Sequence, residues 1–454
     1  MTNLSQSNEQ TAAITAKQIS RYQDTFNARK DAKVVERAVT HQGILATSAD
    51  FASDVDMTPV FSIDLETGKV ANQKQSGRCW MFAALNTMRH ELADLFKLDD
   101  FELSQNYTFF WDKFEKANYF YQNVLDTAVN PITDRKVAFL MATPQQDGGQ
   151  WDMLCAIIEK YGIVPKSAMP ETYSSSKSSE LNTTLNKKLR KDATILRQMV
   201  TDNQSDEAIA KTRDQMLSDV YRLLCYTLGE PVQTFDFEYR DKDHNYHVDR
   251  DLTPKAFYDK YVGWNLDDYV SIINAPTSDK PYNQTYTIEM LGNVLGGRPV
   301  KHLNVDMPTF KQLAIAQLQA GQSVWFGCDV GQSSDRQKGI MDLNAYNKND
   351  LLDIDLSMTK AERLDYGESL MTHAMVITGV DLKEGQPTKW KVENSWGEKV
   401  GHKGYFVMSD RWMDEYCYQV VVNKKFLNPE LQTAQAAEPK VLAPWDPMGA
   451  LASH

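Results

Sequence analysis

The sequence predicts an α+β protein in which helices come first and strands follow after residue 300, with a large helical and hairpin block between them. Three observations support this fold class. Residues 79–96 are good helix formers with no proline or glycine among them. Residues 173–230 hold two charged amphipathic patterns. After residue 300, short runs rich in β-branched and aromatic residues alternate with turns, which is typical of strands.

Length and composition narrow the class of protein. The chain has 454 residues and a formal net charge of −12, which disfavours non-specific binding to phosphate backbones. Neither a basic, then apolar leader nor an 18-residue apolar run is present, so we expect no signal peptide and no membrane span. Five widely spaced cysteines without a CxxC pair indicate a reducing compartment, and we expect a cytoplasmic protein.

Shifts in composition divide the chain into five segments. The first is polar and mixed, and we expect it to pack on the core. The fourth is rich in predicted strands, and the last contains proline and alanine with little helix or strand signal. The predicted segments are an N-terminal segment (1–60), a helical lobe (61–172), the insertion (173–290), a β lobe (291–430) and a C-terminal arm (431–454).

Within the helical lobe, a short strand and loop precede the helix that starts at residue 79. The next predicted helix, 103–129, carries aromatic residues at spacings of three, four and seven, a pattern that predicts a core-facing stripe. These residues are Tyr107, Phe110, Trp111, Phe114 and Tyr121. A glycine-rich loop then leads into a helix that should end near Gly162 and Pro165.

The insertion and the β lobe follow in order. Two charged helices, 174–200 and 206–228, precede a hairpin over 232–250 in which aromatic residues alternate. Thr253-Pro254 then opens a short helix. The strands predicted for the β lobe are 323–330, 373–382, 389–396 and 404–410.

Cys79 is the candidate nucleophile. It opens a predicted helix, where the helix dipole and the unpaired backbone N–H groups favour a thiolate. The other cysteines lie inside apolar runs, which raise the pKa of a thiol, so we expect them to be structural. They are Cys155, Cys225, Cys328 and Cys417.

Three further positions complete a candidate catalytic set. Gln73, six residues before Cys79, can offer its side-chain amide to a developing oxyanion. His373 immediately precedes a β-branched strand, and Asn394 in "ENSWG" can orient its imidazole. Trp396 can shield that hydrogen bond from water. Each residue alone has an ordinary structural explanation, but the ordered set predicts nucleophilic catalysis by cysteine.

This ordered set resembles that of the papain-like cysteine peptidases. Their local signature is C-G-[SA]-C-[WY], and the matching run here is Ser76-Gly77-Arg78-Cys79-Trp80. Ser76 replaces the cysteine that enters a disulfide in secreted members, and Arg78 replaces a small residue. His373 lies about 290 residues after Cys79, against roughly 130–150 in the family. The surplus matches the insertion, as in the bleomycin hydrolase and aminopeptidase C branch.

Several stretches are similar to that branch, and together they span about residues 5–452. They are "NQKQSGRCW", "LGNVLGGRPVKHLNV" and "PWDPMGALA". The resemblance implies a papain-like two-lobed core, with the catalytic cysteine in the helical lobe and the histidine and asparagine in the antiparallel β lobe. It makes Cys79 the nucleophile, His373 the general base and then acid, and Asn394 the orienting residue. Gln73 and the backbone N–H of Cys79 become the oxyanion donors.

The resemblance also implies how substrates bind. Gly148 and Gly149 match a pair that lets a peptide backbone approach in extended form. The C-terminal arm would enter the active-site cleft on the non-primed side, and a terminal carboxylate at Ala452 would pair with the α-ammonium of the substrate. Ser453-His454 extends past that point. The implied activity is an aminopeptidase acting on peptides without a cofactor or metal, and an endopeptidase of the same branch is the alternative.

The remaining expectations concern the oligomeric state, nucleic-acid binding and metal binding. Members of the branch resemble hexameric barrels, so we expect a homohexamer in which residues 173–260 are plausible contacts. The basic run 186–197 suggests nucleic-acid binding as an alternative function. Because the net charge of the chain is acidic, this run more simply indicates a solvated helix face. His244 and His247 lack an evident third and fourth ligand, so we expect no metal site.

Overall fold

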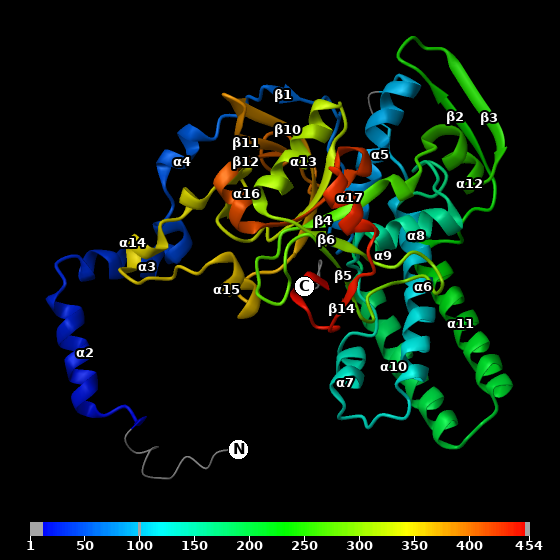
Figure 1. Ribbon diagram of the computed structural model, residues 1–454, viewed down its shortest axis with the longest axis horizontal. Helices are drawn as coiled ribbons and strands as arrows, with labels where there is room; N and C mark the ends of the chain where they lie inside the picture. Colours follow the sequence, from blue (N-terminus) through cyan, green and yellow to red (C-terminus); the bar gives the residue numbers. More distant parts are fainter. Residues whose placement is uncertain (1–11, 99–100, 450–454) are drawn as a thin grey trace. The chain divides into compact units, whose positions relative to one another are not determined.

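The computed structural model describes residues 12–98 and 101–449 (Figure 1). The chain forms two compact units. The smaller comprises Met1–Asp54 with Asn344–Ser357, and the larger comprises Val55–Leu343 with Met358–His454. Residues 344–357 therefore group with the N-terminal segment, although they lie far along the chain. That the N-terminal segment packs on the core stays a prediction.

The smaller unit is helical. Its helices are α2 (Ala16–Ala28), α3 (Ala32–Thr47) and α14 (Lys348–Leu352), and α4 (Phe51–Asp56) begins in it. Thr15 starts α2 with a capping box, because its side chain accepts from the N–H of Gln18 while the Gln18 side chain accepts from the N–H of Thr15. The two parts of the unit are joined where Asn347 Nδ2 donates to Asp50 Oδ2 at 2.7 Å.

The helical lobe of the larger unit follows the predicted order. Its helices are α5 (Cys79–Phe96), α6 (Gln105–Asp126), α7 (Arg135–Ala142) and α8 (Trp151–Tyr161). The aromatic stripe of α6 lies in the core as predicted. Tyr107, Phe110 and Tyr121 are buried, and Trp111 and Phe114 pack against the same cluster. This apolar face fixes α6 beside α5 and α8, and so holds the N-terminus of α5 in place.

The insertion adds two long helices and a hairpin. Its elements are α9 (Tyr173–Ser176), α10 (Ser179–Thr201), α11 (Asp206–Leu228), β2 (Phe235–Arg240), β3 (Tyr246–Leu252) and α12 (Pro254–Phe257). Leu181, Leu185 and Leu189 form a buried row along α10, as the amphipathic pattern predicts. The helices α6, α10 and α11 pack side by side (Figure 1).

The described strands of the β lobe form one twelve-stranded, mostly antiparallel sheet. The central strands run in the order β4 (Tyr269–Ile273), β13 (Cys417–Asn423), β7 (Val324–Cys328), β10 (His373–Lys383), β11 (Gln386–Glu393) and β12 (Tyr405–Ser409). The flanking strands are β1 (Ile63–Asp64), β5 (Gln284–Ile288), β6 (His302–Asn304), β8 (Ser334–Asp335), β9 (Ile340–Met341) and β14 (Lys440–Leu442). The predicted strands correspond to β7, β10, β11 and β12. The α+β fold class is confirmed.

Two features of this lobe differ from the sequence-based division. β4 and β5 pair within the main sheet, although residues 269–288 fall inside the segment predicted as insertion. Residues 269–273 are buried on both faces, so no apolar–polar alternation marks them as a strand. In addition, α13 (Met307–Gln319) and α16 (Asp410–Tyr416) cover a core of sheet residues. Within residues 12–98 and 101–449, no helix combines the length and apolar character that a membrane span requires.

Candidate active site

Cys79 is the first residue of α5 and is only 1% exposed. The carbonyl of Arg78 accepts from the N–H groups of Met81 and Phe82, which starts the helix. The N–H groups of Cys79 and Trp80 therefore have no partner within the helix and face the sulfur. Burial raises the pKa of the Cys79 thiol to about 11, while these two N–H groups and that of Ala374 act to lower it.

Ala374, whose N–H faces the sulfur, directly follows His373, the first residue of β10. The ring Nε2 of His373 lies 2.8 Å from Asn394 Oδ1. The same oxygen accepts from the backbone N–H of Ser395 at 2.7 Å. Because a backbone N–H can only donate, this bond identifies the Oδ1 atom. His373 must then carry its proton on Nε2, which leaves Nδ1 free to accept the thiol proton.

Burial disfavours the charged form of both candidate catalytic groups, Cys79 and His373. Burial lowers the pKa of His373 to about 4, and its hydrogen bond to Asn394 partly opposes this. Neither group therefore gains a charge alone. Transfer of one proton from Cys79 to His373 creates both charges at once, and the backbone N–H groups around the sulfur favour the thiolate that results.

Trp396 lies against the imidazole. The ring centroids of His373 and Trp396 are 4.8 Å apart and inclined by 31°, as expected for a shield over the His373–Asn394 bond. The guanidinium of Arg336 lies 4.2 Å from the centroid of the Trp396 ring, and its charge also lowers the pKa of His373. Arg336 was not predicted as a site residue, since it stands in a polar loop with no motif around it.

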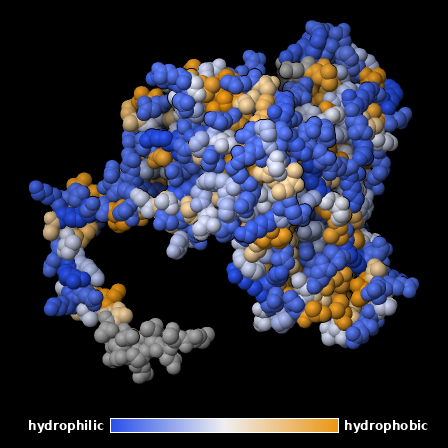
Figure 2. Space-filling model, in the orientation of Figure 1, coloured by the Kyte–Doolittle hydropathy of each residue, from blue (hydrophilic) through white to orange (hydrophobic). Residues whose placement is uncertain are grey.

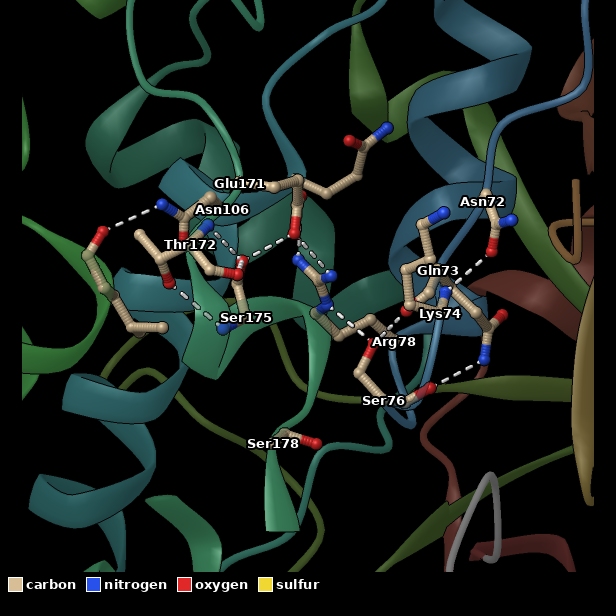
Figure 3. Close-up of polar contacts among 12 residues, drawn as sticks. Asn72, Gln73, Lys74, Ser76, Arg78, Asn106, Glu171, Thr172, Ser175 and Ser178 are labelled. Atoms are coloured by element: carbon tan, nitrogen blue, oxygen red, sulfur yellow. Dashed lines mark hydrogen bonds and ion pairs between the residues drawn. The ribbon is translucent and has the colours of Figure 1, made fainter. Parts of the chain in front are cut away.

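Gln73 is held against the segment that contains Asn394. Its backbone N–H donates to the carbonyl of Ser395 at 2.8 Å, and the N–H of Gly397 donates to the carbonyl of Ala71. The side chain of Gln73 is fixed at both ends, and Figure 3 shows the bond at its nitrogen end to Ser76. Its Oε1 accepts from Ser395 Oγ at 2.5 Å, and its Nε2 donates to the carbonyl of Ser76 at 2.7 Å. One N–H of the amide remains for an oxyanion.

Gly148 and Gly149 lie just before α8. A Cβ on Gly149 would come within 2.6 Å of the Trp80 ring, so no larger residue fits beside the nucleophile. The carbonyl of Gly148 accepts from Lys116 Nζ at 2.6 Å. Lys116 was not predicted as a site residue, because on the sequence it is one charge within a mixed helix.

Asp147 was also missed, although it directly precedes the predicted glycine pair. Its Oδ2 accepts from the N–H of Gly77 at 2.9 Å, and its Oδ1 lies 2.7 Å from Lys113 Nζ. Burial acts to raise the pKa of Asp147, but Lys113 and these hydrogen bonds hold it well below its usual range. The carboxylate thereby ties the loop before Cys79 to the segment that carries Gly148.

The described part of the C-terminal arm lies beside the same glycine. Gly148 and Gly449 both line a cavity of about 360 Å³. Asp446 lies 2.9 Å from Lys280 Nζ, and Arg135 stacks on the ring of Trp445 at 3.6 Å, which anchors the arm. Ala452, the predicted partner of the substrate amine, lies outside the described residues, as does Ser453-His454.

The histidine pair and the basic run 186–197, considered above for metal and nucleic-acid binding, make other contacts in the structure. His247 lies 2.9 Å from Asp241 and stacks on Tyr239. Across residues 12–98 and 101–449, no three His, Cys, Asp or Glu side chains are grouped as metal ligands would be. In the basic run, Lys188 pairs with Asp192, while Arg190 and Arg197 bond to carbonyl groups of neighbouring segments.

Comparison with known proteins finds relatives that span nearly the whole chain. A model of the peptidase C1-like family matches residues 13–449. Aminopeptidase C of Streptococcus thermophilus is 57% identical over 429 residues, covering 94% of this chain and 96% of that protein. Aminopeptidase C of Listeria monocytogenes is 52% identical over 439 residues, covering 97% and 99%. The crystal structure of PepW from Lactobacillus rhamnosis superposes with a TM-score of 0.96 at 67% identity, covering 97% of this chain and 99% of that one.

Proposed function

The chain belongs to the peptidase C1-like family and is a cysteine-type aminopeptidase with a papain-like α+β fold, and on this premise we propose that Cys79 and His373 carry out the hydrolysis. Asn394 orients the imidazole, and Gln73 stabilises the oxyanion. Two observations carry this proposal. The Cys79 sulfur lies at a helix N-terminus and faces the N–H of Ala374. His373, the residue before Ala374, lies with its ring nitrogen 2.8 Å from Asn394.

The proposed reaction begins with transfer of the thiol proton from Cys79 to Nδ1 of His373. The sulfur attacks the substrate carbonyl, and the oxyanion accepts from Gln73 Nε2 and from the N–H of Cys79. As the C–N bond breaks, His373 returns its proton to the leaving amine, and a thioester remains. His373 then takes a proton from a water molecule that attacks the thioester, and the second tetrahedral species releases the free amino acid and the thiol.

The substrate backbone would lie along Gly148 and Gly149, and Trp396 would border the site. The glycine at position 149 lets this segment lie directly against the buried ring of Trp80, with which a side chain there would collide. The bond from Lys116 to the carbonyl of Gly148 keeps this segment rigid. The remaining main-chain groups of the glycine pair are then the proposed partners of an extended peptide.

We further propose that the C-terminal arm limits the cleft to the first residue of a peptide. Deleting residues 449–454 removes the arm whose carboxylate would pair with the α-ammonium of the substrate. A charged hydrogen bond of this kind contributes about 1.5–3 kcal/mol, so the ratio of free to N-acylated aminoacyl-coumarin cleavage should fall by about 10- to 100-fold. Ending the chain at Ala452 is the matched control, and it should preserve or raise aminopeptidase activity. An unchanged ratio in the deletion would contradict the arm proposal, and efficient cleavage of blocked substrates by the intact chain would favour the endopeptidase.

We also propose a homo-oligomer, a hexamer by resemblance, with α2 as one contact. None of the residues of α2 is buried, and the exposed residues Ile19, Tyr22 and Phe26 share a helical spacing of three and four. Hydrophobic side chains are visible at the surface of this helix (Figure 2). Such a face fits a second copy of this chain, and the insertion at 173–260 stays a predicted further contact.

Light scattering tests the assembly. We expect a mass well above the 51.7 kDa of one chain, and a shift toward that value when Ile19, Tyr22 and Phe26 are replaced by serine. Tyr366→Ser, at a still more exposed aromatic residue in the larger unit, should leave the mass unchanged. A monodisperse single chain in the unaltered protein would exclude the oligomer.

A cytoplasmic location is part of the same proposal. All five cysteines have free thiols in the structure, and Cys328 and Cys417 remain unbonded although they pair across β7 and β13. Free thiols suit a reducing compartment. Recovery of the protein outside the cytoplasm in cell fractionation would contradict this.

A further inference from the structure

We propose that Ser76 and Arg78, with Glu171, are positioning residues that set the orientation of the Gln73 side-chain amide. The inference rests on the proposed role of Gln73 as oxyanion donor. Arg78 replaces the small residue of the papain signature, and the sequence alone gives no physical account of it. The structure places its side chain at the centre of a polar network that links the insertion to the loop before Cys79 (Figure 3).

The guanidinium of Arg78 is fixed on all sides. Its side chain is fully buried, with Nη2 lying 2.7 Å from Glu171 Oε2 and Nη1 lying 3.1 Å from Oε1. The rings of Phe82 and Phe109 each lie 5.1 Å from it. Glu171 in turn accepts from Ser175 Oγ at 2.6 Å. A bidentate pair between two aromatic rings leaves the arginine little freedom to turn.

The third donor of Arg78 determines the direction of the next hydrogen bonds. Its Nε lies 2.9 Å from Ser76 Oγ. A guanidinium has no acceptor, so the serine hydroxyl must accept here and direct its own proton elsewhere. It donates to the backbone carbonyl of Gln73 at 2.7 Å. Arg78 therefore fixes the position of Ser76 relative to Gln73 and closes the turn between them.

The closed turn places the carbonyl of Ser76 against the amide of Gln73. The other contact of that amide is the hydroxyl of Ser395, which can donate or accept and so accommodates either orientation of the amide. The carbonyl of Ser76 can only accept, and at 2.7 Å it requires Nε2 on its side. This bond decides which end of the amide carries the N–H groups, and hence whether a donor faces the oxyanion.

Arg78 acts through this geometry rather than through its charge. Burial acts to raise the pKa of Glu171, but the adjacent guanidinium lowers it, so the two groups form a neutral pair. The charged side chain with the largest effect on the pKa of Cys79 is Asp147. Main-chain bonds also join Gln75 of the same loop to Ser176 and Ser178, so Gln73 and Ser76 do not anchor the loop alone.

Ser76→Ala tests the inference with little change in volume. It removes the hydroxyl that joins Arg78 to Gln73, and we expect kcat to fall about tenfold, part of the 10²–10³ that one oxyanion donor supplies. KM should change by less than about twofold. Alkylation of Cys79 by iodoacetamide forms no oxyanion, so its rate should stay unchanged. A parallel fall of kcat and the alkylation rate would overturn the inference, because it would mean that the nucleophile itself is disturbed.

Combination with Gln73→Ala separates the inference from the proposed function. Gln73→Ala alone should lower kcat by about 10²–10³, and adding Ser76→Ala should lower it no further. Full activity in Gln73→Ala would reject Gln73 as the oxyanion donor. A normal loss in Gln73→Ala with a further tenfold loss in the double variant would leave that role in place and reject the positioning by Ser76.

The paired substitution Arg78→Gln with Glu171→Gln provides a second route. It removes both charges together, so no buried charge is left without its partner. We expect the same selective fall in kcat as in Ser76→Ala, and the same absence of an added effect in the Gln73→Ala background. Arg213→Gln is the matched control, since Arg213 bonds Asn118 and Gln122 within the helices and does not touch the loop. An equal loss in the control would reject a specific role for Arg78.

Discussion

Replacement of Cys79 by alanine should abolish turnover of both free and N-acylated substrates, with kcat lowered by on the order of 10⁶-fold, the cost seen when the nucleophile of a catalytic triad is removed. The proposed thioester requires this sulfur. Measurement of aminoacyl-coumarin hydrolysis checks the loss. Intact-mass analysis after a brief pulse of substrate should show an acyl adduct on the unaltered protein alone.

Cys225→Ala is the control for this prediction. Cys225 is the most exposed of the other cysteines, and it lies on α11 in the insertion. Its replacement should leave kcat unchanged and should remove one background alkylation site. Residual hydrolysis by Cys79→Ala above the level of a mock purification would show that another group attacks the substrate, and it would reject the nucleophile proposed for this chain.

Three members of the proposed catalytic set could be predicted because they stand at the boundaries of regular elements. Cys79 begins a helix and His373 begins a strand, as the apolar patterns around them indicated. Asn394 follows a strand whose partner carries His373, so pairing of β10 with β11 brings the two together. Element boundaries and strand order are local enough to infer from a sequence. The roles of these residues remain proposals that the variants test.

The supporting residues could not be predicted in the same way. Arg78 bonds Glu171, which lies 93 positions further along the chain, and Lys116 bonds Gly148, which lies 32 positions further along. Such partners depend on how α6, α8 and the start of the insertion pack, and no sequence period encodes that packing. The same limit applies to β4 and β5, whose place in the sheet is set by β13 and β14 from the far end of the chain.

These contacts give the insertion a role near the active site. Ser178 and Asn182 donate to Asp147, which also accepts from the N–H of Gly77. Glu171 holds Arg78 from the segment just before α9. The start of the insertion is therefore bonded to the loop before Cys79 and to the segment before Gly148. It supports both the proposed oxyanion donor and the proposed substrate-binding segment.

His373→Asn should lower kcat by an amount comparable to Cys79→Ala, and it should also change how the thiol titrates. Asparagine keeps a neutral side chain of similar size but cannot take the proton of Cys79. Burial, which raises the pKa of the thiol in the structure, would then hold it at about 11. Because the thiolate is the deprotonated form, its fraction at pH 7 should be about 10⁻⁴ and should rise tenfold for each pH unit up to about pH 10.

Iodoacetamide labelling of Cys79, followed by peptide mass spectrometry in a Cys225→Ala background, measures this change without relying on turnover. With His373 present, proton transfer within the pair supplies thiolate at neutral pH, so labelling should be fast and nearly independent of pH from about 6 to 9. With His373→Asn it should be slow at pH 7 and steeply dependent on pH. Asn394→Ala should fall between the two, because the imidazole remains but its tautomer is no longer fixed. Identical pH profiles with and without the imidazole would mean that the helix N-terminus alone generates the thiolate, and His373 would then act only on the leaving amine and the water.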